Sequence, residues 1–244
     1  MWRDALRRLW CGLLDTVYPP LCLLCGVHLH HEEHHVCAGC LARLPLISSP
    51  CCPRCSRPLR TRDGRDQLCG ACRLAAHTLV EQIAACGEFR GGLRHLIHLL
   101  KYKRYQCLAP LLGDLLARRC LATRVLHDVQ WLAPIPLHWT RQRWRGFNQA
   151  RELARRTSAA SGVPLLPPGV LRRVRRTTPQ VTLTAAGRAA NIKGAFAVTK
   201  PALVRGARIA LVDDVITTGA TSDECARVLL RGGAAAVRLL VLAR

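Results

Sequence analysis

Short apolar runs and longer stretches with helical spacing alternate along the chain from about residue 80 onward. The short runs hold too few residues for helices and predict buried strands. They lie at 131–135, 209–212 and 237–242. The longer stretches predict helices, most clearly where apolar residues recur every three or four positions. They lie at 93–100, 108–121, 149–158 and 222–231. The pattern therefore predicts a domain of mixed strands and helices over 80–244.

A further helix is predicted at the start of the chain, at 1–20. Apolar residues recur at helical spacing from Leu6 to Val17, and Pro19 and Pro20 end the helix. Three arginines in this stretch leave two interpretations open. The helix could lie on a membrane surface, or it could pack on the protein itself, which we favour. No run approaches the roughly 18 apolar residues that span a bilayer, and we find no signal-peptide core, so we expect a cytoplasmic protein.

Eight of the 14 cysteines form four Cys-x-x-Cys pairs. Each pair is a knuckle whose thiolates converge on one ion, and two knuckles supply the four thiolates that structural zinc prefers. Such pairs indicate zinc in a reducing compartment rather than disulfides. The pairs are Cys22/Cys25, Cys37/Cys40, Cys52/Cys55 and Cys69/Cys72. We therefore predict a double zinc ribbon over 21–76, with two structural zinc ions.

The knuckles can combine in two ways. Gaps of 11 and 13 residues inside the first two and last two pairs fit short hairpins and favour consecutive ribbons at 22–40 and 52–72. The gap between the second and third pairs is also 11 residues, so crossed pairing stays open. Cys51 and the histidines of the first gap should stay outside the metal sites, because four thiolates complete each site. Arg54, inside the third pair, could face nucleic acid or only solvent.

The stretch at 209–221, IALVDDVITTGAT, carries the clearest chemistry. A buried strand that enters a helix through a tight loop leaves backbone N–H groups free at the helix N-terminus, where they bind anions. Asp213 and Asp214 would repel a phosphate, so they suit vicinal hydroxyls or a divalent cation. The loop that follows offers threonine hydroxyls and a glycine that allows close approach to a phosphate. It consists of Thr217, Thr218, Gly219, Ala220 and Thr221. A phosphate site beside a diol site predicts a ribose 5-phosphate; a helix capped only by Thr221 and Glu224 is the alternative.

The chain is strongly basic, with 37 Lys and Arg against 15 Asp and Glu and a formal net charge of +22. This charge favours nucleic acid or phosphorylated substrates as partners. Lys101 and Lys103 could reach a phosphate or complement the end of a helix. The loop at 138–148 could bind pyrophosphate through its arginines or, with its tryptophans, stack on bases. Its arginines are Arg141, Arg143 and Arg145.

The string at 209–221 resembles the phosphoribosyl pyrophosphate (PRPP) signature of the type I phosphoribosyltransferases. The resemblance implies an α/β fold, with a Rossmann-like parallel sheet and helices on both faces. It also implies that Asp213 and Asp214 hold the ribose hydroxyls, that the loop at 217–221 holds the 5-phosphate, and that Mg2+ binds with PRPP. The stretch at 171–191 has no clear period and predicts a long mobile loop. In such a fold it would be a hood that shields the reacting sugar from water.

Three further features narrow the resemblance: the segments at 133–154 and 171–196 and the four cysteine pairs. With the PRPP motif they resemble the ComF family, of the ComFC and GntX type, from about Cys22 to the C-terminus. The resemblance implies a role in natural transformation, with single-stranded DNA and the DNA-uptake machinery as partners. One expectation is a Mg2+-dependent phosphoribosyltransferase. The other is a non-catalytic nucleic-acid-binding protein, in which PRPP is an effector or the site is vestigial.

Overall fold

The computed structural model describes residues 20–30, 33–75, 78–102, 105–138, 143, 146–175, 177 and 185–244. The predicted helix at 1–20 lies almost wholly outside the described residues. Among the helices of the described part, none is long and apolar enough to cross a bilayer.

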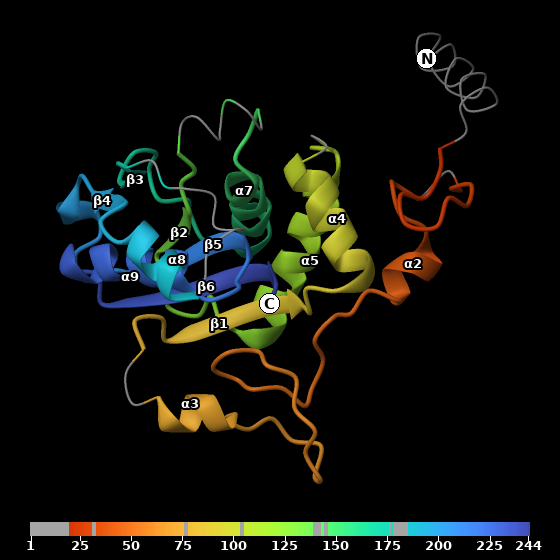
Figure 1. Cartoon of the computed structure of the whole chain (residues 1–244), viewed down its shortest axis with the longest axis horizontal. Coiled ribbons are helices and arrows are strands. Elements are labelled where there is room, and N and C mark those ends of the chain that lie inside the picture. The colour runs from red at the N-terminus through yellow and green to blue at the C-terminus, as the bar shows by residue number, and fades with distance from the viewer. Residues whose placement is uncertain are drawn as a thin grey trace.

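A four-stranded parallel sheet organises the fold, in the order β1-β6-β5-β2 (Figure 1). The strands are β1 (Gln82–Gly87), β6 (Ala236–Ala243), β5 (Arg208–Val215) and β2 (Trp131–Pro134). Alternate side chains enter two separate apolar clusters, with Leu239 and Val241 on one face and Leu240 and Leu242 on the other. A sheet buried on both faces explains why its strands form continuous apolar runs in the sequence.

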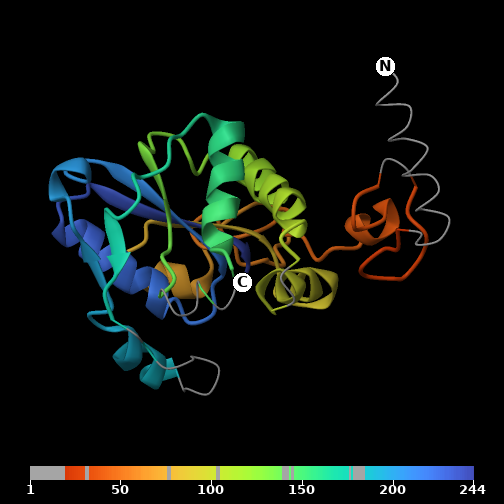
Figure 2. The ribbon, with the colours of Figure 1, turned by 90° about the horizontal axis from the view of Figure 1, so that it is seen from above.

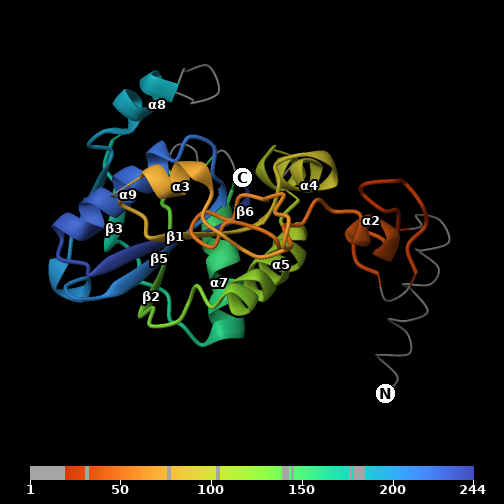
Figure 3. The ribbon, with the colours of Figure 1, turned by 90° about the horizontal axis from the view of Figure 1, so that it is seen from below.

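Helices cover both faces of this sheet (Figures 2 and 3). On one face lie α5 and α7, and on the other lies α9. A fourth helix, α4, lies beside the C-terminus, just beyond the end of β6 (Figures 1 and 3). The bounds are α4 (Gly91–Tyr102), α5 (Leu108–Thr123), α7 (Gln149–Ser161) and α9 (Ala220–Arg231). The predicted α/β class, a parallel sheet with helices on both faces, is confirmed.

Several elements differ from the sequence prediction. The strand predicted at 209–212 continues to Val215 and includes both aspartates, because its pairing with β6 continues to Ala243. The stretch at 171–191, predicted as one long loop, contains β3 (Leu171–Arg173) and α8 (Ala185–Ile192). β3 pairs antiparallel with β4 (Phe196–Val198). β1 was not predicted, since its alanines and glycine give a weak apolar signal.

The zinc-ribbon segment covers the open edge of β1. The Ile83 N–H donates to the Arg54 carbonyl at 2.8 Å, and the Ser56 hydroxyl donates to the Ile83 carbonyl at 2.8 Å. The Ile47 N–H continues this pairing by donating to the Cys86 carbonyl at 2.7 Å. An uncovered edge strand exposes unpaired N–H and C=O groups. The ribbon therefore completes the sheet on the side where no further strand pairs with β1.

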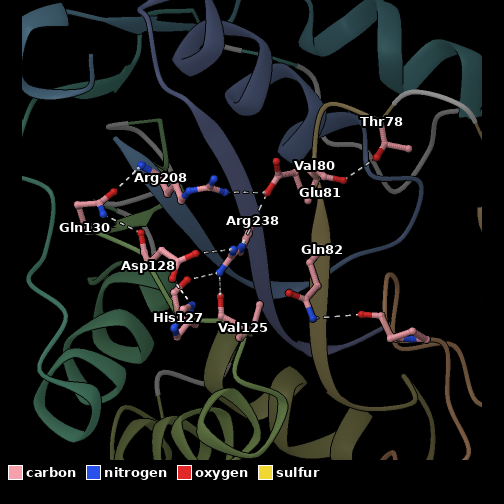
Figure 4. Close-up of polar contacts among 11 residues, drawn as sticks. Thr78, Val80, Glu81, Gln82, Val125, His127, Asp128, Gln130, Arg208 and Arg238 are labelled. Atoms are coloured by element: carbon pink, nitrogen blue, oxygen red, sulfur yellow. Dashed lines mark hydrogen bonds and ion pairs between the residues drawn. The ribbon is translucent and has the colours of Figure 1, made fainter. Parts of the chain in front are cut away.

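A polar network fastens the amino ends of the strands (Figure 4). The guanidinium of Arg238 in β6 donates to the Val125 carbonyl at 2.7 Å and lies 3.9 Å from the Glu81 carboxylate. Arg208, which begins β5, lies 3.6 Å from the same carboxylate. Its backbone N–H donates to the Gln130 side-chain oxygen at 2.7 Å. These contacts join β5, β6, the residue before β1 and the connection after α5. They all lie at the amino ends of the strands, so the carboxyl ends stay free for a site.

Gly87 ends β1 at a point of very close approach. A Cβ added there would lie 2.5 Å from the Pro45 carbonyl oxygen and 2.6 Å from Cδ2 of Leu93. We expect Gly87→Ala to lower the free energy of unfolding by about 1–3 kcal/mol, because backbone must shift to relieve the overlap. Urea denaturation measures this change. In the control Gly39→Ala the added Cβ meets nothing within 4 Å, so equal losses in both variants would contradict the close approach.

Candidate functional site

Asp213 and Asp214 lie within the last three residues of β5. Because successive side chains of a strand point to opposite faces, the two carboxylates face different helices. Asp214 faces Lys101 of α4. Asp213 faces α9, where burial first, and then the Asp213 charge, raise the pKa of the Cys225 thiol. Both aspartates nevertheless reach the same cavity at the end of the strand.

Lys101 forms an ion pair with Asp214. Its Nζ lies 2.8 Å from Oδ1 of Asp214, and the two side chains are only 17% and 9% exposed. The sequence left two roles open for Lys101, a phosphate contact or a complement to the end of its helix, and the structure places its ammonium on the second aspartate. Nothing local in the sequence indicates this pairing, since it depends on how α4 packs against the end of β5.

Asp213 has a perturbed carboxyl group. Burial, reinforced by the charge of neighbouring Asp214, raises its pKa from 3.8 to about 7, although the Lys101 ammonium and the Asp214 N–H act in the opposite direction. That N–H donates to Oδ1 of Asp213 at 2.9 Å. Lys101 pairs directly with Asp214. Asp213, which has no direct cation partner among the described residues, is therefore the aspartate whose pKa is raised.

The loop after β5 leads directly into α9. This is the strand–loop–helix arrangement that the sequence predicted for an anion-binding turn. Gly219 is the N-cap of α9 and has a φ of 81°, a left-handed conformation that favours glycine. The Asp223 N–H makes the first helical bond, to the Gly219 carbonyl at 2.8 Å. A helix leaves its first N–H groups without partners inside the helix, and this helix end lines the cavity together with the exposed Thr217 and Thr218.

The alternative capping box is wrong. Within the described part of the chain, no side chain of the N-cap residue caps α9, which begins at Ala220 and not at Ser222. Glu224, the expected partner of Thr221, instead accepts the Gly194 N–H at 2.7 Å. The helix start is therefore held by Gly219, and its N–H groups are not covered by a glutamate from its own first turn.

A cavity of about 330 Å³ lies at the carboxyl end of the sheet. Its volume is within the range of small-molecule sites, and its position, outside the carboxyl ends of parallel strands, is the usual ligand position in open α/β sheets. It is lined by residues of β5 and β6 and by residues that follow β1 and β2. Its lining includes Phe89, Lys101, Ile135, Asn148, Arg173, Asp213, Asp214, Thr217, Thr218, Gly219, Ala220 and Thr221.

The predicted pyrophosphate contacts are placed only in part. Arg141, Arg145 and Lys103 lie outside the described residues, and Arg143 is described as exposed. The sequence reasoning missed Arg173 and Phe89 as cavity residues. Arg173 is one of four arginines within 172–176, which offered a weak signal, whereas Phe89 follows a strand that was itself not predicted.

The eight predicted zinc ligands form two clusters of four cysteines, paired consecutively. One cluster joins Cys22, Cys25, Cys37 and Cys40, and the other joins Cys52, Cys55, Cys69 and Cys72. Within each cluster all sulfur atoms lie within 4.8 Å of one another. The Sγ atoms of Cys25 and Cys37, and those of Cys55 and Cys69, are 3.7 Å apart. Tetrahedral zinc with Zn–S bonds of about 2.3 Å needs sulfurs about 3.8 Å apart, so both clusters fit structural zinc.

Backbone N–H groups stabilise the thiolate form of Cys22 in the first cluster and of Cys52 and Cys69 in the second. Burial alone would raise the pKa of Cys22, but N–H bonds from Cys37, Leu24 and Cys25 outweigh it and lower the pKa to about 6. The same balance lowers the pKa of Cys52 to about 7. Metal ligands must be deprotonated, so these bonds favour metal binding.

Secondary structure near the clusters is shorter than the predicted hairpins. The second knuckle of each ribbon begins a five-residue helix, α2 (Ala38–Ala42) or α3 (Gly70–Leu74). Arg54 does not face outward: its guanidinium donates to the Cys72 and Ala75 carbonyls, both at 3.0 Å. These bonds hold the end of α3.

Comparison with known proteins assigns the chain to a family. Residues 13–73 match the Double zinc ribbon domain. The DNA utilization protein YhgH of Salmonella typhi is 34% identical over 231 residues, which cover 93% of this chain and 97% of that protein. Competence protein F of Haemophilus influenzae is 32% identical over 228 residues, which cover 91% and 96%. The chain belongs to the ComF family. Competence protein ComFC of Bacillus subtilis, a more distant ComF relative, is 26% identical over 238 residues, which cover 95% and 93%.

ComF membership confirms the resemblance drawn from the cysteine pairs and the string at 209–221. Two solved structures show partial likeness. The allosteric regulatory enzyme of purine biosynthesis aligns with a TM-score of 0.37 and 20% identity, over 55% of this chain and 25% of that chain. Glutamine PRPP amidotransferase from Bacillus subtilis aligns with a TM-score of 0.36 and 20% identity, over 54% and 25%.

The two clusters give a prediction for metal content. Cys52 belongs to the second cluster, whereas its neighbour Cys51 lies outside both. We expect Cys52→Ser to lower the zinc content from about two ions per chain to about one, because a four-thiolate site loses a ligand. Atomic emission of the purified protein measures the ratio. Cys51→Ser is the matched control and should keep both ions; loss of zinc from it would contradict the ligand assignment.

The acid pair gives a prediction of opposite sign for its two members. Between pH 4 and the raised Asp213 pKa of about 7, the native state binds more protons than the unfolded state, so the raised pKa costs stability as the pH rises. Asp213→Asn should therefore raise the free energy of unfolding at pH 8 by about 1–2 kcal/mol, with the gain shrinking toward pH 5.

Asp214→Asn is the matched control for this measurement. It leaves the half-buried Lys101 ammonium without its partner at 2.8 Å, so stability at pH 8 should fall. Denaturant melts at pH 5 and pH 8 test both variants. If Asp213→Asn destabilises the protein as much as Asp214→Asn does, burial is not what perturbs Asp213.

Proposed function

We propose that the cavity binds PRPP together with Mg2+. The observation that carries this proposal is that two carboxylates and the N-terminus of α9 line one cavity of about 330 Å³. The loop at 217–221 would hold the 5-phosphate through backbone N–H groups and threonine hydroxyls. The carboxylates of Asp213 and Asp214 would accept hydrogen bonds from the ribose hydroxyls. Gly219, in its left-handed conformation, lets the backbone approach the phosphate.

The residues of the cavity fit Mg2+. This ion prefers oxygen ligands from one or two carboxylates together with substrate phosphates, and the end of β5 offers two carboxylates. When bound, Mg2+ would neutralise charge on the pyrophosphate oxygens. The Lys101 ammonium already compensates Asp214, so ligand entry must share or displace that ion pair.

The reaction that suits such a site is phosphoribosyl transfer. An acceptor would attack C1 of the ribose, the bond from C1 to the pyrophosphate oxygen would break, and the acceptor would release its proton to solvent. Arg173 lines the cavity and would contact the leaving pyrophosphate, with Lys101, Lys103, Arg141, Arg143 and Arg145 as further candidates. Electrostatic stabilisation of the departing charge, and not a strong base, would supply most of the rate.

We also propose that this ComF protein acts on single-stranded DNA in natural transformation, with the DNA-uptake machinery as partner. Relatives named for competence and for DNA utilization support this role, and the formal net charge of +22 suits a polyanion. The proposed location is the cytoplasm, because eight reduced cysteines in two zinc sites require a reducing compartment.

The second candidate function is a nucleic-acid-binding protein without catalysis, in which PRPP is an effector or the site is vestigial. The Lys101–Asp214 ion pair favours it, because the position of the cation is already filled by a side chain. The two candidates differ in turnover. With Mg2+ and PRPP present, an enzyme must release pyrophosphate faster with some acceptor than by hydrolysis alone.

Calorimetric titration of PRPP with Mg2+ into the zinc-loaded protein tests the cavity. We expect binding near the micromolar range for the wild type and at least about 100-fold weaker binding for Asp213→Asn, since the ribose hydroxyls lose a charged acceptor. Asp114→Asn, an exposed position on α5, is the control and should bind as the wild type does. No PRPP binding to the wild type would overturn the proposal for the cavity.

The same protein then separates the two functions. Pyrophosphate release is followed with nucleobases, amines and single-stranded DNA as acceptors. Acceleration by one acceptor, lost in Asp213→Asn, supports the enzyme. Binding of PRPP with no acceleration by any of them favours the effector function.

A further inference from the structure

Aromatic and basic side chains form a ladder along one face of α4. Arg94, His98 and Tyr102 recur every four residues and so lie on one face of the helix. The centroids of the His98 and Tyr102 rings are 5.5 Å apart, edge to face. Phe89, which precedes the helix, lies 6.0 Å from His98, and the Arg94 guanidinium lies 5.9 Å from the Phe89 ring. We call Phe89, Arg94, His98 and Tyr102 the α4 ladder.

The ladder is open to solvent. Tyr102 is 46% exposed, His98 and Arg94 are exposed, and Phe89 is half-buried. Large exposed rings on a helix face usually mark a binding surface rather than a core position. The other face of α4 already supplies the core, through Leu93, Leu96, Ile97 and Leu100. The ladder is thus extra to what folding of the helix requires.

The charges around the ladder favour an anionic partner. Residues 89–102 contain three Lys or Arg, two His and no acid. Burial, and after it the charges of Arg94, Lys101 and His95, lowers the pKa of His98. The lowered pKa favours the neutral imidazole, which offers a flat face for stacking. The acid just before this segment, Glu88, is already paired with Arg90.

The ladder adjoins the cavity. Phe89, which belongs to the ladder, and Lys101, which precedes Tyr102 in α4, both line the cavity. The first turn of α4 packs on the first zinc ribbon, where a Cβ at Gly92 would lie 3.0 Å from Leu24 and 3.1 Å from Leu44. Figures 1 and 3 show α4 between the ribbon that holds α2 and the C-terminus after β6.

We propose that the α4 ladder binds single-stranded nucleic acid, with bases stacked on Phe89, His98 and Tyr102 and phosphates on Arg94 and its basic neighbours. The choice of a single strand follows from the rings, because only unpaired bases expose faces for stacking on a protein surface. The bound strand would then lie directly beside the cavity. This inference rests on the proposed function for its ligand, DNA, but it does not require that PRPP be bound.

Fluorescence anisotropy of a labelled oligothymidine of about 12 nucleotides, a length within the range of known single-strand sites, tests the ladder. We expect the double variant His98→Ala, Tyr102→Ala to weaken binding about 10-fold or more, since stacking on one ring contributes roughly that factor per base. The control for the first change is His127→Ala, a histidine at the other end of the sheet whose side chain is 79% exposed. It should bind within about 2-fold of the wild type.

A second pair of variants separates position from charge. Arg94→Gln removes a ladder cation and should weaken binding several-fold. Arg155→Gln removes an α7 arginine that is 66% exposed and should change binding far less. If the two variants lose equal affinity for the oligonucleotide, only net charge attracts the strand, and the proposal that the α4 ladder binds it is wrong.

Photocrosslinking provides a readout that does not depend on variants. An oligomer with 5-iododeoxyuridine at one position should crosslink to peptides from residues 89–102 of the wild type. Crosslinks confined to other segments, or a double variant that binds within about 2-fold of the wild type, would overturn the inference.

Calorimetry with Mg2+ and PRPP on the same proteins distinguishes this failure from failure of the proposed cavity function. If the protein binds PRPP and the ladder variants do not weaken DNA binding, only the ladder proposal is wrong. DNA binding that maps to the ladder in a protein that does not bind PRPP supports the ladder and rejects the cavity proposal alone.

Discussion

β5 lies between β6 and β2 and pairs in parallel with both, and most other features follow from this arrangement. Parallel strands bring all their carboxyl ends to one edge, where the cavity opens. Buried strands also carry any charge at their ends into a poorly solvated place. Asp213 and Asp214 are therefore costly where they stand: Lys101 compensates one of them, and the pKa of the other rises to about 7. Such a perturbed group beside a cavity is typical of functional sites.

The zinc ribbons are part of the sheet rather than an appendage to it. The main chain of Arg54 and Ile47 and the hydroxyl of Ser56 pair with the free edge of β1. Immediately after β1 comes Phe89, which lines the cavity and begins the α4 ladder. The geometry of the cysteine clusters is therefore connected to the cavity through one short strand. Zinc loss should disturb that wall of the cavity even though both clusters are far along the chain from β5.

Two kinds of anion chemistry meet along this edge of the molecule. The turn at Gly219 offers backbone N–H groups and suits a compact phosphate. The surface of α4 offers rings and spaced cations and suits an extended strand. Lys101 connects the two regions, because it precedes Tyr102 in α4 and its ammonium pairs with Asp214 at the cavity.

Local patterns in the sequence determined much of this protein. Apolar runs predicted β2, β5 and β6, Cys-x-x-Cys spacing predicted eight metal ligands, and the string at 209–221 predicted a strand, an acid pair and an anion-binding turn. Each of these signals lies within a few neighbouring residues, so it can be recognised without knowing which distant segments come together. The tertiary structure alone decided the contacts between distant segments. It paired Lys101 with Asp214, turned Arg54 inward, placed β1 between the ribbon and β6, and brought Phe89 to the cavity. No local pattern encodes those contacts, because they depend on how separate elements pack in three dimensions.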